Sequence, residues 1–427
     1  MEINNKIINA ISKSIKGTEY ENKVFVVGGF VRDLIMGKDP KDIDLLIDGD
    51  INAGITFAEW FCKKENIFKK DSNPLVYGLY GTAMFQFMGE KIECVAPRSE
   101  KYQNDSRNPV VSSCTLEDDC FRRDFTVNSL FINISNNELV DYSKTGLNDI
   151  KNKVIRSTSN PDIIFNDDSL RILRMVRFAS KLGFEIEDET LKGAIRNVDR
   201  LEIISKERIQ DEFSKMITSG NPELAIGLLF EIGAYKYVFD KLWFESESKY
   251  LAESIPASFE KLKAQKDAEH NNLEINLAIV YAQLPNVVDR MKYLKFSNDV
   301  IEKVRFYLEV FDMIYFTEFT PASVRKVQYL AKSYDNLFNA CTIFVSVMNR
   351  KGDSERVEKI ISMTKKMIEK GQAMFGYKLP VDGNDVMEIL NINPSEKVKR
   401  YLNLLMDMAY VNPFITKKEC ETILKCN

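Results

Sequence analysis

One segment near the N-terminus constrains the fold more than any other part of this 427-residue chain. Residues 24–50 read VFVVGGFVRDLIMGKDPKDIDLLIDGD. A short apolar run ends at Gly28-Gly29, helical spacing follows over residues 30–36, and a second apolar run covers residues 43–47. Adjacent glycines mark a turn, and the β-branched residues on either side favour strands. The segment therefore predicts a strand, a Gly-Gly turn, a helix and a second strand.

The hydrophobic pattern changes at about residue 162. Before it, we expect a helix at 53–64 and a hairpin with strands at 82–87 and 91–95. After it, helical periodicity covers residues 168–182, 209–218, 222–233, 272–283, 298–311 and 355–370. The expected fold class is an α/β N-terminal region followed by an all-α second half.

Composition narrows the class of protein. No apolar run is long enough to cross a bilayer, and the N-terminus lacks the apolar segment of a secretory signal. The seven cysteines form no C-x-x-C pair, so we expect reduced thiols in a cytoplasmic protein. The single histidine, His270, excludes His-rich metal chemistry and argues against a Ser-His-Asp mechanism. A net charge of -4 gives no general nucleic-acid coat but permits a local basic surface.

Two common nucleotide-binding motifs do not fit the glycines. A dinucleotide fingerprint needs G-x-G-x-x-G, but here Gly28 and Gly29 are adjacent. A P-loop needs Gly-Lys followed by Ser or Thr, and Gly37-Lys38 is followed by Asp39.

The pair Asp42 and Asp44 points to a different chemistry. Residues two apart on a strand share a face, where two carboxylates repel each other. A shared Mg2+ would relieve that repulsion, since Mg2+ prefers a few carboxylates together with substrate phosphates. The turn before the helix offers backbone N–H groups to a phosphate, and Arg32 can reach a phosphate oxygen. A lone D-x-D pair is more often solvated, so it is the order of all four elements that indicates nucleotidyl transfer.

Four motifs resemble one enzyme family. The segment GGFVRD, followed by KDIDLLI, resembles the first motif of the tRNA nucleotidyltransferase and bacterial poly(A) polymerase family, class II of the polymerase-β-like nucleotidyltransferases. Its R-R-D-F-T-I-N motif is similar to EDDCFRRDFTVNSLFIN at 117–133. Its nucleobase-reading helix is similar to DDSLRILRMVRFASKLGF at 167–184, and its neck helix to SKERIQDEFSKMI at 205–217. The resemblance is strong over 23–239 and weaker beyond.

The resemblance implies a polymerase-β-like nucleotidyltransferase head followed by an all-α neck, body and tail. The implied boundaries are 1–156 for the catalytic head, 157–220 for the nucleobase-reading neck, 221–374 for the body and 375–427 for a tRNA-binding tail. With His270 as its only histidine, the body is expected to lack a His-Asp phosphohydrolase site. Lys397, Lys399 and Arg400 are candidates for phosphate contacts in the tail, or equally for a solvated helix face.

The resemblance also assigns roles in the head. Asp42 and Asp44 would be the catalytic Mg2+ ligands, and Gly29 and Arg32 would hold the triphosphate. Glu93 is a candidate third carboxylate, with an ordinary strand carboxylate as the equal alternative.

Within RRDFT, Arg123 would contact the incoming nucleotide, while Asp124 and Asn128 would serve the ribose or the scaffold. Without the resemblance, the two arginines and the aspartate would be interpreted as a surface ion pair.

Asp168 and Arg171 are the implied base selector. Lying three apart, they are expected on one helix face. The carboxylate would accept from the exocyclic amine of C or A while arginine donates to the ring, and uracil and guanine present a carbonyl instead. The alternative is an Asp that favours the helix dipole, with a local salt bridge. By resemblance Arg174 and Arg177 also contact the nucleotide; otherwise they form a solvated basic stripe.

The implied activity is template-independent addition of C, C and A to the tRNA 3′ end from CTP and ATP, with Mg2+. CC-adding, A-adding and poly(A) polymerase specificities remain alternatives, as does a non-catalytic RNA-binding relative. A poly(A) polymerase is expected to end in a strongly basic extension, whereas this chain ends in CETILKCN. A pure binder has no need of Asp42 and Asp44. The expected partners are tRNA, CTP and ATP without a membrane, and the oligomeric state is left open.

Overall fold

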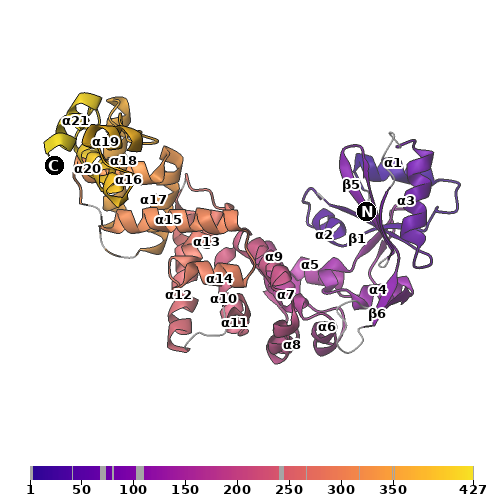
Figure 1. Ribbon diagram of the computed structural model, residues 1–427. Helices are drawn as coiled ribbons and strands as arrows, with labels where there is room; N and C mark the ends of the chain where they lie inside the picture. Colours follow the sequence, from indigo (N-terminus) through magenta and orange to yellow (C-terminus); the bar gives the residue numbers. More distant parts are fainter. Residues whose placement is uncertain are drawn as a thin grey trace. The chain divides into compact units, whose positions relative to one another are not determined.

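The computed structural model describes residues 3–40, 42–67, 74–78, 81–101, 110–239, 245–265, 267–316, 318–348, 350 and 352–426. The chain forms two compact units, Met1–Val238 and Phe239–Asn427. Every strand in these ranges lies in the first unit, and the second unit is built from helices (Figure 1). This confirms the expected α/β head followed by helices, and the finer division into head, neck, body and tail stays a prediction. Within the same ranges, no helix has both the length and the apolar character needed to cross a membrane.

A seven-stranded sheet with strand order β3-β4-β5-β2-β1-β8-β9 forms the centre of the head. Its strands are β1 (Val24–Val27), β2 (Ile43–Ile47), β3 (Leu75–Tyr77), β4 (Thr82–Phe87), β5 (Glu90–Val95), β8 (Phe131–Asn133) and β9 (Leu139–Val140). Only the β2–β5 pairing in this sheet is parallel, and it places Asp44 opposite Glu93. All four residues of β1 are buried, because this strand lies between β2 and β8.

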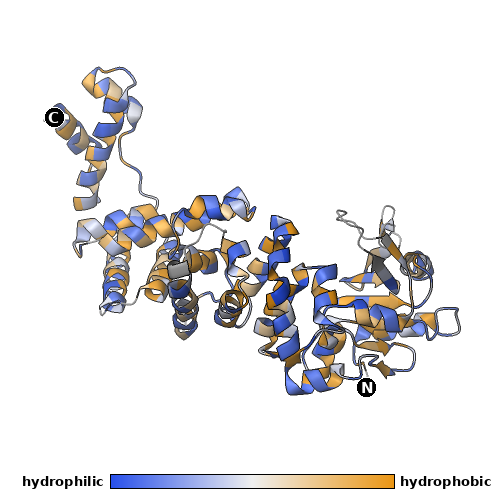
Figure 2. Cartoon of the chain, turned by 90° about the horizontal axis from the view of Figure 1, so that it is seen from below, coloured by the Kyte–Doolittle hydropathy of each residue, from blue (hydrophilic) through white to orange (hydrophobic). Residues whose placement is uncertain are grey.

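Two helices flank the first strands in the chain, one before β1 and one after β2. In α3 (Ala53–Lys64), the buried Phe61 ring lies 5.4 Å from the Phe85 ring and 5.1 Å from the Phe87 ring, measured between centroids. The helix α1 (Lys6–Ile15) was not predicted; the Asn5 side chain accepts from the N–H groups of its first turn, and its isoleucines are buried. Figure 2 shows helices that carry both colours, as expected of helices with one buried and one exposed face.

Further helices complete the first unit. They are α2 (Gly29–Ile35), α4 (Leu116–Arg122), α5 (Gly146–Asn152), α6 (Pro161–Asp167), α7 (Leu170–Leu182), α8 (Asp188–Asn197), α9 (Lys206–Ile217), α10 (Pro222–Glu231) and α11 (Tyr235–Phe239), with 3-10 turns at Thr126–Asn128 and Val198–Ile203. Two small sheets pair β6 (Arg98–Lys101) with β7 (Val110–Ser113), and β10 (Val154–Ile155) with β11 (Glu185–Ile186). The helix α7 packs against α9 and α10 and ends at Gly183, whose φ of 68° suits a glycine C-cap.

The second unit contains only helices in the ranges given above. They are α12 (Glu245–Ala264), α13 (Leu273–Tyr281), α14 (Val287–Tyr293), α15 (Asn298–Phe316), α16 (Pro321–Ala331), α17 (Tyr334–Val347), α18 (Asp353–Glu369), α19 (Gly383–Leu390), α20 (Glu396–Val411) and α21 (Lys417–Cys426). Seven consecutive residues of α13 are buried, which identifies it as a central helix. The last three helices share a core that includes Val386, Leu405 and Leu424.

Most predicted elements occur where the sequence placed them. The bounds of β2, α3 and β4 agree with the prediction, and α2 begins one residue earlier than expected. The helix predicted at 168–182 begins instead at Leu170, and the one predicted at 209–218 already begins at Lys206. The first of these shifts changes the geometry of the proposed base selector.

Candidate active site

The two carboxylates of the D-x-D motif lie at the start of β2. Asp42 is exposed and directly precedes the strand, whereas Asp44 is half-buried and lies opposite Glu93 of β5. The pKa of Asp44 is raised to about 6, chiefly by burial and then by the Glu93 charge; the Asp42 charge also raises it, against the opposing effect of Arg123. Negative charge therefore accumulates here at a cost that a bound cation would relieve.

Asp42 and Asp44 suit a magnesium ion that is held partly by substrate and water, rather than a metal ion held by protein side chains alone. Within the part of the chain that the structure describes, no three His, Cys, Asp or Glu side chains group closely enough to hold a metal ion. Mg2+ suits such a site, because it is usually bound through one or two carboxylates, with water and substrate phosphates as the remaining ligands. The role of Glu93 as a third carboxylate stays a prediction.

The Gly-Gly turn brings the backbone close to two arginines. Gly28 has a φ of 70°, a conformation that side chains disfavour. A Cβ atom added to Gly29 would lie 3.4 Å from Arg32 Nη2, and one added to Gly28 would lie 3.9 Å from Arg123 Nη1. The turn, Arg32 and Arg123 are thus neighbours, as the prediction of a shared triphosphate site requires.

Arg123 is held in place by a carboxylate that the sequence analysis did not select. Asp119, fully buried on α4, accepts from Arg123 Nε at 2.9 Å and Nη2 at 2.8 Å, and from Arg122 Nη2 at 2.6 Å. Burial opposes ionisation of Asp119, but the Arg123 and Arg122 guanidiniums outweigh it and lower the pKa of the carboxyl group. The spacing of three and four residues on one helix is a signal that was present in the sequence.

Arg32 belongs to a buried polar chain that reaches α7. Its Nη1 donates to Asn128 Oδ1 at 2.6 Å, and Asn128 Nδ2 donates to Asp124 Oδ1 at 3.2 Å. Asp124 Oδ2 accepts from Arg174 Nε at 2.8 Å and Nη2 at 2.6 Å. Burial acts to raise the pKa of Asp124, yet Arg174 and these hydrogen bonds lower it. The ribose or scaffold role of Asp124 and Asn128 stays a prediction.

Three predicted nucleotide contacts surround one aromatic ring. The guanidinium carbons of Arg32, Arg174 and Arg177 lie 5.5, 5.3 and 4.1 Å from the centroid of the buried Phe178 ring. Glu212 of α9, also buried, accepts from Arg177 Nε at 2.6 Å and lies 4.0 Å from Arg174 Nη1. Neither Phe178 nor Glu212 was predicted, because their roles depend on the packing of α7 against α9.

Asp168 lies outside the helix in which it was expected. It caps α6 in an extended conformation, with φ of -143°, and α7 begins two residues later. Its Oδ1 accepts from the backbone N–H of Leu170 at 3.1 Å, and its Oδ2 accepts from Arg208 Nη2 at 2.7 Å. The expectation that Asp168 shares a helix face with Arg171 is therefore wrong, although both residues lie at the start of α7.

Arg171 is anchored by main-chain carbonyl groups. Its Nη1 donates to the carbonyl of Ile164 at 3.2 Å, and its Nη2 donates to that of Arg122 at 2.7 Å. The second bond connects α7 to the end of α4, next to Arg123. A guanidinium carries five N–H donors, so these two bonds fix its plane while other donors face elsewhere.

Comparison with known proteins gives a consistent result. The Poly A polymerase head domain matches residues 24–156, and the probable RNA and SrmB-binding site of polymerase A matches residues 183–245. The CCA-adding enzyme of Pediococcus pentosaceus is 31% identical over 291 residues, covering 68% of this chain and 68% of that protein. The tRNA nucleotidyltransferase cca2 of Schizosaccharomyces pombe is 25% identical over 478 residues, covering 99% and 98%.

The fold has a counterpart among solved structures. A crystal structure of the Bacillus stearothermophilus CCA-adding enzyme in complex with CTP matches with a TM-score of 0.76 at 20% identity, covering 100% of this chain and 98% of that one. At this identity the match establishes the fold, and the match to the Pediococcus protein establishes the relationship. The chain belongs to the tRNA nucleotidyltransferase and poly(A) polymerase family.

Proposed function

We propose that this protein adds C, C and A to the 3′ end of tRNA from CTP and ATP, without a template and with Mg2+. Enzymes of the family use a divalent metal ion. The observation that carries the proposal is the antiparallel pairing of β1 with β2, which brings the Gly28-Gly29 turn, with Arg32 and Arg123 beside it, to the end of β2 that carries Asp42 and Asp44. A carboxylate pair suited to a metal thus lies near arginines suited to a triphosphate.

Asp42 and Asp44 would hold the Mg2+ ion. When bound, the ion supplies charge stabilisation to the phosphates and activation to the attacking 3′-hydroxyl of the RNA. Arg32 and Arg123 would bind triphosphate oxygens and stabilise the departing pyrophosphate through charge-assisted hydrogen bonds. The missing side chain at Gly29 leaves the triphosphate room beside Arg32.

Asp168 and Arg171 would read the nucleobase. The Asp168 carboxylate offers acceptor oxygens to the amine of a base, and one of these oxygens already accepts from Arg208. An ionised carboxylate selects the exocyclic amine of C or A and is repelled by the carbonyl of uracil or guanine. Arg171 would donate to the ring, and Arg174 and Arg177 would contact the nucleotide from the same helix.

We include the cytoplasm in this proposal. All seven cysteines are free, including those buried in each unit. Free thiols are typical of proteins in reducing compartments. Fractionation of the source cells, followed by detection of the chain in each fraction, tests this location.

The test of the activity uses a tRNA transcript that lacks its 3′-CCA. The transcript is incubated with the protein, Mg2+ and all four nucleoside triphosphates, and the new 3′ ends are sequenced. Growth that stops after C, C and A supports the proposal, and the Asp44→Ala variant should give no growth. Termination after CC, addition of A to CC-ended transcripts alone, or a long A tail would each contradict the proposed specificity. If the protein extended neither the transcript that lacks CCA nor a CC-ended transcript, nucleotidyl transfer itself would be contradicted.

A further inference from the structure

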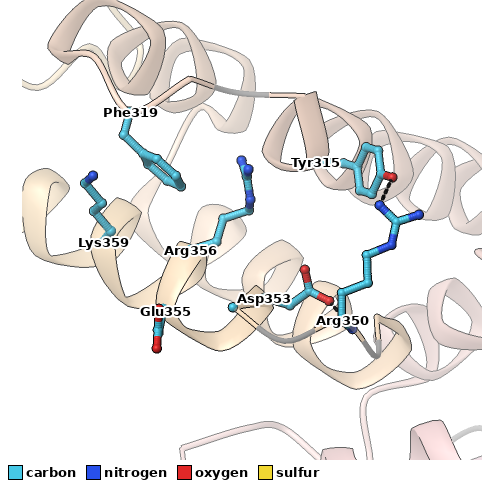
Figure 3. Close-up of a pocket in the computed structure, with 8 residues that line it drawn as sticks. Tyr315, Phe319, Arg350, Asp353, Glu355, Arg356 and Lys359 are labelled. Carbon is cyan, nitrogen blue, oxygen red and sulfur yellow. Dashed lines mark hydrogen bonds between the residues drawn. The ribbon is translucent and has the colours of Figure 1, made fainter.

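A basic and aromatic pocket of about 560 Å³ lies in the second unit, and no role assigned so far involves it. Tyr315 at the end of α15 and Phe319 before α16 form one wall, and the start of α18 forms the other. The cations that line it are Arg350, Arg356 and Lys359. Figure 3 shows all three beside the two aromatic rings. This volume accommodates a nucleotide-sized group.

The aromatic rings hold the cations in place. The Arg356 guanidinium and the Lys359 ammonium lie 4.7 and 4.4 Å from the centroid of the Phe319 ring. The Arg350 guanidinium lies 5.3 Å from the Tyr315 ring centroid and donates to the Tyr315 hydroxyl group. Cation–π contacts restrict side chains without neutralising their charge. Arg356 Nη1 also donates to the carbonyl of Ile314 at 3.4 Å, so the case for anion binding rests on Arg350 and Lys359.

The acidic residues of the pocket do not cancel this charge. Asp353 Oδ2 accepts from the backbone N–H of Arg350 at 2.6 Å and thus stabilises the turn before α18. Glu355 points away from Phe319 and Arg356 in Figure 3. Three cations therefore line the pocket together with two carboxylates, of which Asp353 is engaged in a turn.

We propose that this pocket binds a phosphate group of an RNA backbone. Guanidinium and ammonium groups around an open pocket suit a phosphodiester, and exposed Arg350 and Lys359 can be approached from solvent. The choice of RNA rests on the proposed function, in which CTP and ATP are assigned to the first unit and tRNA supplies many further backbone phosphates. Free phosphate and free nucleotide share the same chemistry and are distinguished by the test.

The test measures the affinity of the full-length protein for tRNA as a function of salt. In the double variant Arg350→Gln/Lys359→Gln, the slope of log affinity against log salt should fall by about one to two, with affinity about tenfold weaker at low salt. The matched control is Lys365→Gln, which removes an exposed charge from α18 outside the pocket. Arg356→Lys keeps the charge and should weaken binding less.

Extension kinetics separate this proposal from the proposed function. The double variant should raise KM for tRNA about tenfold while kcat at saturating tRNA stays unchanged. If wild-type protein extends no tRNA but the double variant still binds it less tightly, the proposed function fails and the pocket assignment holds. Equal tRNA affinity and equal salt slope in the double variant and in Lys365→Gln would overturn the assignment. Loss of binding to inorganic phosphate or ATP alone, with tRNA binding intact, would overturn it as well.

Discussion

Two arginines of the first unit and one of the second differ in the kind of partner that holds them. In the first unit, Arg174 pairs with Asp124, and Arg123 pairs with Asp119. In the second unit, the buried Arg325 of α16 donates to the carbonyls of Gln372, Tyr410 and Val411 at 3.2, 2.9 and 3.1 Å.

The difference lies in what the partner can do. A carboxylate can be protonated, and its arginine can turn toward a phosphate with little change in the backbone. A carbonyl cannot be protonated, so its bond to an arginine does not depend on pH. Arg174 and Arg123 are thus held by partners that titrate, whereas Arg325 joins α16 to the ends of α18 and α20 through partners that do not.

The largest effect should come from the carboxylates of β2. Asp42→Ala or Asp44→Ala should slow extension by at least about a thousandfold, since metal chemistry supplies several kcal/mol of transition-state stabilisation. Binding of tRNA should change less than about threefold, because phosphate contacts elsewhere provide that affinity. Single-turnover extension and a filter-binding titration measure the two quantities. Substantial extension by either variant would show that the first unit does not depend on a metal held at β2.

The second-largest effect should be a loss of stability when the charge of Asp124, the partner of Arg174, is removed. Asp124→Asn leaves a guanidinium without its ionised partner and should cost about 3–5 kcal/mol of stability at pH 7. The folded pKa of Asp124 is lowered, so the stabilisation is complete above the unfolded value and is lost as pH falls through the folded value. Hydrogen exchange of α7 should show the difference at pH 7, and urea unfolding should show it narrowing below about pH 4. A constant difference across that range would argue against a charged pair.

Arg325→Met should cause a smaller loss of stability, and this loss should not depend on pH. The variant leaves three carbonyls without this donor and should destabilise α20 by about 2–4 kcal/mol. Because carbonyls do not titrate, the loss should be the same at pH 5 and pH 8. Hydrogen exchange of α20, compared with that of α7 as the internal control, measures it. Equal exposure of both helices would contradict the contrast between the two units.

The smallest predicted effect is a gain in stability. Asp44 has a folded pKa of about 6, above the ordinary value of 3.8, so its ionised form destabilises the metal-free fold at neutral pH. With a chelator present, Asp44→Asn should increase the free energy of unfolding by about 1–2 kcal/mol at pH 7. This figure allows for solvent screening, because the Asp44 side chain is only half-buried. The gain should decrease as pH falls from 7 to 4, where wild-type Asp44 becomes protonated. Thermal unfolding in chelator at several pH values checks this, and a destabilised variant would contradict the charge argument.

Local features of the fold were predictable from sequence. The end of β2 was predicted because its apolar run stops at Asp48-Gly49. The placement of β8 beside β1 was not, because no local pattern encodes which distant strand completes a sheet.

The candidate site shows the same limit. The D-x-D pair and the arginines stood out as residue types, and Asp119 could have been found from its helical spacing to Arg122 and Arg123. Arg208 lies forty residues from Asp168, and only the packing of α9 against α7 brings them together. The helix boundary at Asp168 could not be predicted from the apolar pattern. The structure marks it by the extended backbone of Asp168 and by the hydrogen bond from the Leu170 N–H to the Asp168 side chain.

The position of β1 inside the sheet also governs how the head is made. Phe25 pairs with Leu46 on one side and with Asn133 on the other. At about 5–20 residues per second, the ribosome needs on the order of 5–20 s to proceed from β2 to β8. Until then the apolar β1–β2 pair has an open edge, which invites pairing with other nascent chains. Slow translation between these strands should therefore lower the yield of folded protein.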